Sequence, residues 1–196
     1  MNVYDFDNTI YDGESLVDFF IFCMKKKPEL TLYFPFVLYI LVLYKLRLLP
    51  IEKIYDVATK MTSPIMSNKD CADDFVEEFW KKNHSKLKKE FLEMLTAEDI
   101  IITGSPRILV SGIIEQLKIL PSNLVCSEFD LDTGKCEFIC FRENKAYVFK
   151  EKFPNIVIDN FYTDSLNDIP MMKLSKQSYL VKGKKKIKMI DPNVYR

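Results

Sequence analysis

The chain has 196 residues, 48% of them hydrophobic and 29% charged, which suits one buried core that carries a sizeable insertion. Its 28 Lys and Arg balance 28 Asp and Glu, so the overall charge favours no polyanionic partner, and we expect no nucleic acid. The five cysteines are scattered without a close CxxC pair, and there is a single histidine. We therefore expect free thiols and a cytoplasmic protein, in preference to a disulfide framework.

The first residues predict a buried strand that runs into a loop. NVYDF, residues 2–6, is a short apolar run that ends in acidic residues and the turn-prone dipeptide DN. The N-terminus lacks the basic start and long apolar run of a signal peptide, so we expect no export.

A helical pattern follows from Gly13 to about Thr96, with breaks at Pro28, Pro50 and Ser63-Pro64. Within it, residues 30–44 (LTLYFPFVLYILVLY) contain no charged side chain. This segment is too short to cross a membrane, which takes about 20 apolar residues. Two interpretations stay open: a buried or half-buried helix that packs within the insertion, or a helix that contacts a lipid surface.

From Asp99 onward, strand and helix patterns alternate. We predict strands in DIIITGSP, NLVCSEFD, NIVIDNFYTD and YLVKG, and helices in RILVSGIIEQLKIL and NKAYVFKEKF. This alternation indicates an α/β fold with a parallel sheet flanked by helices. We expect a core domain of residues 1–12 and 97–196, with an all-helical domain of residues 13–96 inserted after the first strand.

The strongest chemical signal is DFDNT, residues 5–9, at the end of the first predicted strand. Asp5 and Asp7 are two residues apart, so on a strand their carboxylates would point the same way and repel. A divalent cation with oxygen ligands, such as Mg²⁺, would resolve that conflict. An acidic turn without chemistry is the alternative for this motif alone.

Three further polar features follow in order. Thr103 ends an apolar run and begins a Gly-Ser-Pro turn at Gly104, where a hydroxyl and backbone N–H groups could hold phosphate. Lys145 lies at a predicted helix start, where its ammonium could balance the carboxylates. Asp164 and Asp168 follow an apolar strand and suit a second acidic contribution to one metal.

In this order, DFDNT, ITGSP, Lys145 and TDSLND resemble the four motifs of the haloacid dehalogenase (HAD) superfamily. The resemblance covers almost the whole chain, and the helical insertion resembles the cap of the phosphoserine-phosphatase-like branch, subfamily IB. It implies a Rossmann-like core. The last motif usually reads Gly-Asp-Asp or Gly-Asp-Ser, whereas Thr163 precedes Asp164 here; we expect this to change the loop geometry but not the metal ligand.

The resemblance implies a Mg²⁺-dependent phosphatase acting on a phosphomonoester, with a small phosphorylated metabolite as substrate. Asp5 would be the nucleophile that forms an aspartyl phosphate, and Asp7 would act as acid and then base. Thr103 and Lys145 would bind the transferring phosphoryl group.

The same resemblance implies the metal and substrate contacts. Asp5, the backbone carbonyl of Asp7, and Asp164 would hold Mg²⁺, with Asp168 supporting Lys145 or the metal shell. Substrate contacts are expected from three residues near the catalytic loops: Asn8, Gly104 and Glu14. In relatives that act on phosphoserine, an acidic residue at the position of Glu14 receives the substrate amine.

Asp7 also separates this chain from other members of the superfamily. Dehalogenases lack an acid at that position and P-type ATPases carry threonine there, so hydrolysis of a phosphate ester is favoured, with a mutase second. Two alternatives stay open: a lipid-phosphate (phosphatidylglycerophosphate-like) phosphatase with weak membrane-surface contact through the cap, and a non-catalytic phosphate-binding module. The sequence predicts no oligomeric state.

Overall fold

The structure is a computed structural model, and it describes residues 1–45, 48, 53, 56–57, 59–60, 63, 69–183 and 186–192. The predicted helix breaks at Pro50 and Pro64 lie outside these residues. The cysteines whose side chains are described are buried free thiols, as expected: Cys23, Cys126, Cys136 and Cys140.

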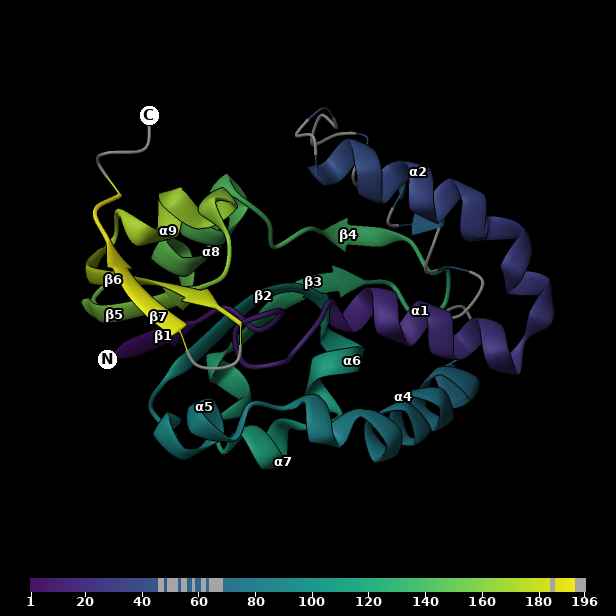
Figure 1. The fold of residues 1–196 in the computed structure, drawn as a ribbon, viewed down its shortest axis with the longest axis horizontal. Coiled ribbons are helices and arrows are strands. Elements are labelled where there is room, and N and C mark those ends of the chain that lie inside the picture. Colours follow the sequence, from purple (N-terminus) through teal and green to yellow (C-terminus); the bar gives the residue numbers. More distant parts are fainter. Residues whose placement is uncertain are drawn as a thin grey trace.

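A seven-stranded sheet in the order β4-β3-β2-β1-β5-β6-β7 forms the α/β core (Figure 1). Its central strands are parallel: β1 pairs with β2 and β5, which pair in turn with β3 and β6. The strands are β1 (Asn2–Tyr4), β2 (Ile100–Pro106), β3 (Leu124–Phe129), β4 (Cys136–Phe138), β5 (Ile158–Thr163), β6 (Ser175–Lys182) and β7 (Lys186–Ile190). The predicted α/β class, with a parallel sheet flanked by helices, is confirmed.

The two edge strands were not predicted, and both are antiparallel. β7 lies in the lysine-rich run near the end of the chain, where Lys186 and Lys188 alternate with Ile187 and Met189. The strands predicted from the sequence did not include this run, although its alternation has the period of two that a strand requires. Lysines are common on edge strands, where they discourage pairing with another sheet.

Helices cover both faces of the sheet (Figure 1). On one face lie α8 (Glu143–Lys152) and α9 (Ile169–Met172); on the other lie α5 (Lys89–Met94), α6 (Arg107–Ser111) and α7 (Ile114–Leu117). Successive strand residues point to opposite faces, so Val3 packs with Phe149 of α8, whereas Tyr4 packs with Phe91 of α5. Burial on both faces explains why the central strands read as continuous apolar runs.

The prediction of a single helix over RILVSGIIEQLKIL was wrong, because the helix is interrupted at Gly112, between α6 and α7. A Cβ at Gly112 would lie 2.6 Å from Val76 Cγ1 and 3.2 Å from Trp80 Cδ1, so only glycine admits α4 (Lys69–Asn83) this closely. The Trp80 indole N–H then donates to the Leu109 carbonyl oxygen at 2.8 Å. This contact joins the inserted helices to the core.

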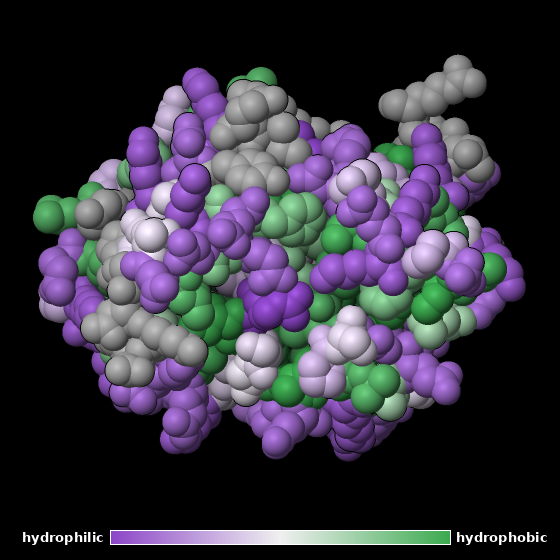
Figure 2. Space-filling model, turned by 180° about the vertical axis from the view of Figure 1, so that it is seen from behind, coloured by the Kyte–Doolittle hydropathy of each residue, from purple (hydrophilic) through white to green (hydrophobic). Residues whose placement is uncertain are grey.

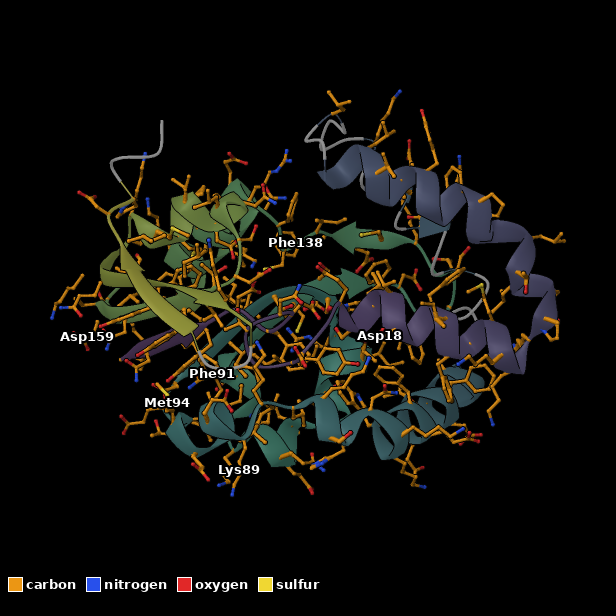
Figure 3. All side chains as sticks on the ribbon, viewed as in Figure 1. Asp18, Lys89, Phe91, Met94, Phe138 and Asp159 are labelled. Atoms are coloured by element: carbon orange, nitrogen blue, oxygen red, sulfur yellow. The ribbon has the colours of Figure 1, made fainter. Side chains whose placement is uncertain are left out.

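The described helices of the insertion are α1 (Ser15–Lys26), η1 (Pro28–Tyr33), α2 (Phe34–Lys45), α4, η2 (His84–Lys86) and α5. α1 and α4 pack through edge-on aromatic contacts, such as Phe19 with Phe79 at 5.5 Å between ring centroids. α5 packs on the sheet instead: Phe91 points from it toward the strands (Figure 3) and meets Tyr4 and Tyr162. The domain division at residues 12 and 97 stays a prediction.

Residues 30–44 form the end of η1 and most of α2, and only part of this segment is buried. Leu30 and Ile40 are buried, whereas Leu32 is 85% exposed and Tyr39 is 59% exposed. Packing within the insertion therefore does not account for the whole segment. Among the described residues, no helix combines the length and apolar character needed to cross a bilayer.

Candidate active site

The loop that carries Asp5 and Asp7 begins where β1 ends. The Asp5 backbone N–H donates to the Tyr162 carbonyl at 2.8 Å, which continues the pairing of β1 with β5. Asn8 then adopts a positive φ of 54°, a left-handed conformation that asparagine tolerates well, and its N–H donates to the Gly13 carbonyl at 2.9 Å. This tight turn keeps Asp5 and Asp7 at the carboxyl end of the sheet.

Asp5 belongs to a buried cluster of polar side chains that come from the ends of two strands, β1 and β5, and from the helix α8. Lys145 Nζ, in the first turn of α8, donates to Asp5 Oδ1 at 3.0 Å and to Asp168 Oδ2 at 2.9 Å. The Thr163 hydroxyl at the end of β5 donates to the same Asp168 oxygen at 2.8 Å. Since Lys145 is 3% exposed and Asp168 is 2% exposed, these groups satisfy one another and not solvent.

The electrostatics of the cluster are dominated by burial. Burial raises the pKa of Asp5 well above its usual range; Lys145 opposes the shift, and Asp168, Asp164 and Asp7 add to it. For Lys145, burial by itself would lower the pKa, but Asp168 and Asp5 more than reverse that effect, so the ammonium stays charged. The carboxylates thus outnumber the positive charge that holds them.

Asp7 is held apart from this cluster by two serines. The Ser15 backbone N–H donates to Asp7 Oδ1 at 2.7 Å, and the Ser105 hydroxyl donates to Asp7 Oδ2 at 2.7 Å. The two serine hydroxyls lie 2.8 Å apart. Burial raises the pKa of Asp7, while the hydrogen bonds from Ser15 and Ser105 lower it, a balance that suits an acid–base group.

The sequence interpretation missed Ser15 and Ser105. Ser105 had a detectable signal, because it lies two residues after Thr103 and a strand places such residues on one side. We expected the strand to end at Thr103, but β2 continues to Pro106 with a shift of register between Ile102 and Pro106. This irregularity directs the Ser105 hydroxyl to Asp7.

Thr103 is fully buried, and its hydroxyl oxygen accepts the Ser105 N–H at 3.1 Å, which leaves the hydroxyl hydrogen for donation. Gly104 is exposed beside it, and its carbonyl oxygen accepts the Ser127 hydroxyl at 2.6 Å. Their role as phosphate ligands stays a prediction.

Asn8 and Glu14 lie together at the mouth of the loop, where Asn8 Nδ2 donates to Glu14 Oε1 at 2.8 Å. Lys88, which sequence reasoning also missed, is 6% exposed and donates to the carbonyl oxygens of Asn8 and Gly183. A lysine in a polar run carries no sequence signal of burial. Here it joins the loop after β1 to the turn between β6 and β7.

Among the described residues, no group of three or more His, Cys, Asp or Glu side chains is arranged to hold a metal by itself. The metal ligands predicted from the sequence include only two carboxylates, those of Asp5 and Asp164, together with the backbone carbonyl of Asp7. Asp164 interacts electrostatically with Asp7 and Asp168, and burial first, then Asp168, raises its pKa to about 6. An excess of buried carboxylates over Lys145 fits a hard divalent cation.

Solved structures share this fold. A protein of unknown function from Bordetella pertussis Tohama I is 14% identical, with a TM-score of 0.73 over 91% of this chain and 87% of its own. A phosphoserine phosphohydrolase-like protein from Francisella tularensis subsp. tularensis SCHU S4 is 17% identical, with a TM-score of 0.61 over 91% and 86%. Cytosolic 5′-nucleotidase IIIB bound to cytidine is 14% identical, with a TM-score of 0.53 over 89% and 68%.

None of the curated proteins compared with the chain matches it in sequence. The family model of the haloacid dehalogenase-like hydrolases, however, matches residues 3–173, a range that includes Asp5, Asp7, Lys145 and Asp168. The chain therefore belongs to the haloacid dehalogenase-like hydrolase family.

Proposed function

We propose that the chain is a phosphatase that hydrolyses a phosphomonoester through an aspartyl phosphate on Asp5. The observation that carries this proposal is the ammonium of Lys145 between Asp5 and Asp168, at 3.0 and 2.9 Å. The two buried carboxylates hold the ammonium beside the proposed nucleophile, where it could contact the oxygens of an arriving phosphoryl group.

In the first step, an Asp5 carboxylate oxygen attacks phosphorus, and the bond from phosphorus to the leaving oxygen breaks. Asp7 donates its proton to that oxygen, for which its raised pKa is suited. In the second step, Asp7 takes a proton from water, the water oxygen attacks phosphorus, and the bond to Asp5 breaks. Throughout, Lys145 and the Thr103 hydroxyl stabilise the charge on the phosphoryl oxygens.

Asp5, Asp164 and the Asp7 carbonyl would hold Mg²⁺, which when bound supplies positive charge to the phosphoryl oxygens and offsets the crowded carboxylates. The residues themselves set the orientation. Ser15 and Ser105 hold both oxygens of Asp7, so the acid cannot turn away from the leaving group without losing a hydrogen bond.

A small phosphorylated metabolite is the substrate class we propose. Two proteins with the same fold, the phosphoserine phosphohydrolase-like protein and the 5′-nucleotidase, carry names of phosphomonoester hydrolases. Glu14, held by Asn8 at the mouth of the loop, offers a negative charge to a substrate amine. The exposed apolar residues of η1 and α2 favour a second candidate, a lipid phosphate.

Hydrolysis of p-nitrophenyl phosphate with and without Mg²⁺ tests the proposal, with Asp5→Asn as the variant. Asp132→Asn is the matched control, since it makes the same change at an exposed carboxylate in the turn after β3. Wild type and Asp132→Asn should release product only with Mg²⁺, and Asp5→Asn should not. If the wild type releases none above buffer, the proposal is overturned, and a non-catalytic phosphate-binding module is the alternative that stays.

A further inference from the structure

Apolar side chains face water along η1 and α2, at one end of the molecule. Their exposed fractions are 85% for Leu32, 37% for Phe36, 59% for Tyr39 and 48% for Val42. In Figure 2, hydrophobic residues reach the surface among hydrophilic ones at this end, on the left of the view. We propose that this surface, Leu32 with Phe36, Tyr39 and Val42, docks on an anionic lipid bilayer.

The exposed residues of α2 form one stripe of the helix. Residues three apart on a helix are neighbours, offset by about 60° around the axis, so Phe36, Tyr39 and Val42 span about 120°. Exposure peaks at Tyr39 and falls at Phe36, and Ile40, next around the helix, is 9% exposed. The helix therefore has an inner side that packs on the protein and an outer side that no described residue covers.

Basic residues adjoin the stripe, which distinguishes a membrane from other occupants. α1 ends in Lys25 and Lys26, Lys27 follows, and η1 begins at the next residue. The uncharged segment of residues 30–44 ends at Lys45. Lysines that flank an apolar face are typical of segments lying in the headgroup region, where their charge meets anionic lipid.

A groove between α1 and α4 adds to this positive charge. The groove has a volume of about 450 Å³. Its lining includes four lysines and one acidic residue, Asp18, which is labelled on α1 in Figure 3. The other lining residues include Ile21, Lys25, Lys26, Lys82 and Lys86. Lys86 pairs with Asp18 at 2.8 Å and Lys26 with Glu78 at 2.5 Å. Within the described ranges, Lys25 and Lys82 form no ion pair with a carboxylate.

The charge also argues against a second copy of the chain as the occupant. In a two-fold dimer the same surface faces itself, and lysines at the end of α1 that lie near the axis would approach their own copies and repel. Acidic residues also lie near this end, at Glu29 in η1 and at Glu77 and Glu78 on α4, so the positive charge is confined to the groove and to the lysines that flank the stripe. An anionic bilayer satisfies both the apolar stripe and the lysines.

The inference that the chain docks on a bilayer depends only on this surface. Its consequence for catalysis, that a phosphomonoester carried by a lipid would be within reach of Asp5, rests on the proposed function. Flotation of the full chain with vesicles of phosphatidylglycerol and phosphatidylcholine, against phosphatidylcholine alone, tests the docking. We expect binding to the anionic vesicles, weaker binding in high salt, and the same binding by Asp5→Asn. Docking without phosphatase activity would keep this inference and remove only the proposed function.

Tyr39→Glu and Tyr147→Glu form a matched pair, because Tyr147 on α8 is 61% exposed and Tyr39 is 59% exposed. Tyr39→Glu should weaken anionic-vesicle binding at least about tenfold, since it places a charge in the docked face. Tyr147→Glu should bind as the wild type does. Lys82→Glu should weaken binding by about fivefold or more, because one lysine near an anionic surface contributes about that much. Lys89→Glu makes the same change at another exposed lysine and should leave binding unchanged.

Melting curves of each variant show whether it is folded. The inference is overturned by absent binding to anionic vesicles, by equal binding to neutral ones, or by equal binding of Tyr39→Glu and Tyr147→Glu. A concentration-dependent dimer that Tyr39→Glu abolishes, in the absence of vesicle binding, would assign the surface to a second copy.

Discussion

The end of the sheet that holds the proposed active site and the η1–α2 surface both depart from the usual distribution of side chains, in which charged groups are exposed and apolar groups are buried. At the sheet end, Asp5, Lys145 and Asp168 are charged and buried; on η1 and α2, Leu32 and Tyr39 are apolar and exposed. The buried charges satisfy one another through short hydrogen bonds, whereas the exposed apolar groups have no described partner. Lys145 thus finds its partners within the chain, whereas the exposed apolar groups point to a partner outside it.

After Asp5→Asn, which should abolish turnover, substitution of the proposed acid–base residue Asp7 should give the largest effect. Asp7→Asn keeps the shape of the side chain but cannot exchange the proton, so we expect turnover to fall by about 10²–10⁴-fold. Turnover of p-nitrophenyl phosphate with saturating Mg²⁺ measures this, with Asp132→Asn as control. A decrease under threefold would remove Asp7 from the mechanism.

Lys145→Met should break the buried cluster itself. Removing one partner of a buried ion pair costs about 3–5 kcal/mol, because Asp5 and Asp168 then lie buried without compensation. Urea unfolding should show this loss, and the double variant Lys145→Met with Asp168→Asn should recover part of it. If Lys145→Met unfolds at the wild-type urea concentration, the cluster does not hold this end of the sheet together.

Some of these residues could be identified as site residues from the sequence, and others could not. The resemblance of DFDNT, Lys145 and TDSLND to the family motifs implied that these residues form one site, and the structure brings Asp5, Lys145 and Asp168 into contact. Thr163 was expected only to alter a loop, yet its hydroxyl binds Asp168. Ser15 donates its backbone N–H to Asp7, and since every residue but proline carries that group, this contact has no sequence signal.

Ser105→Ala should have a smaller effect. It removes one hydrogen bond to a carboxylate, worth about 1.5–3 kcal/mol, and so should lower turnover by about tenfold to a hundredfold. Because the Ser105 hydroxyl lowers the pKa of Asp7, its loss should raise that pKa. Asp7 must be protonated to act as the acid, so the alkaline limb of the kcat/KM profile should move to higher pH. An unmoved limb would contradict this role.

The effect of Mg²⁺ on stability should be the smallest and should depend on pH. The pKa of Asp164 is raised to about 6, so in the metal-free protein its contribution to stability is present below its unfolded pKa and is lost as pH rises through about 6. Mg²⁺ needs the ionised carboxylate. Saturating Mg²⁺ should therefore raise Tm clearly at pH 8 and little at pH 5. Equal increases at both would place the metal elsewhere.

The central claim is that Asp5 carries the phosphoryl group, and acid quenching during turnover tests it most directly. With Asp7→Asn, in which hydrolysis of the intermediate is slowed, mass spectrometry of the quenched and digested protein should find one phosphoryl group on the peptide that contains Asp5. The same treatment of Asp5→Asn should find none. Product release without a phosphorylated Asp5, or phosphorylation that persists in Asp5→Asn, would contradict the account.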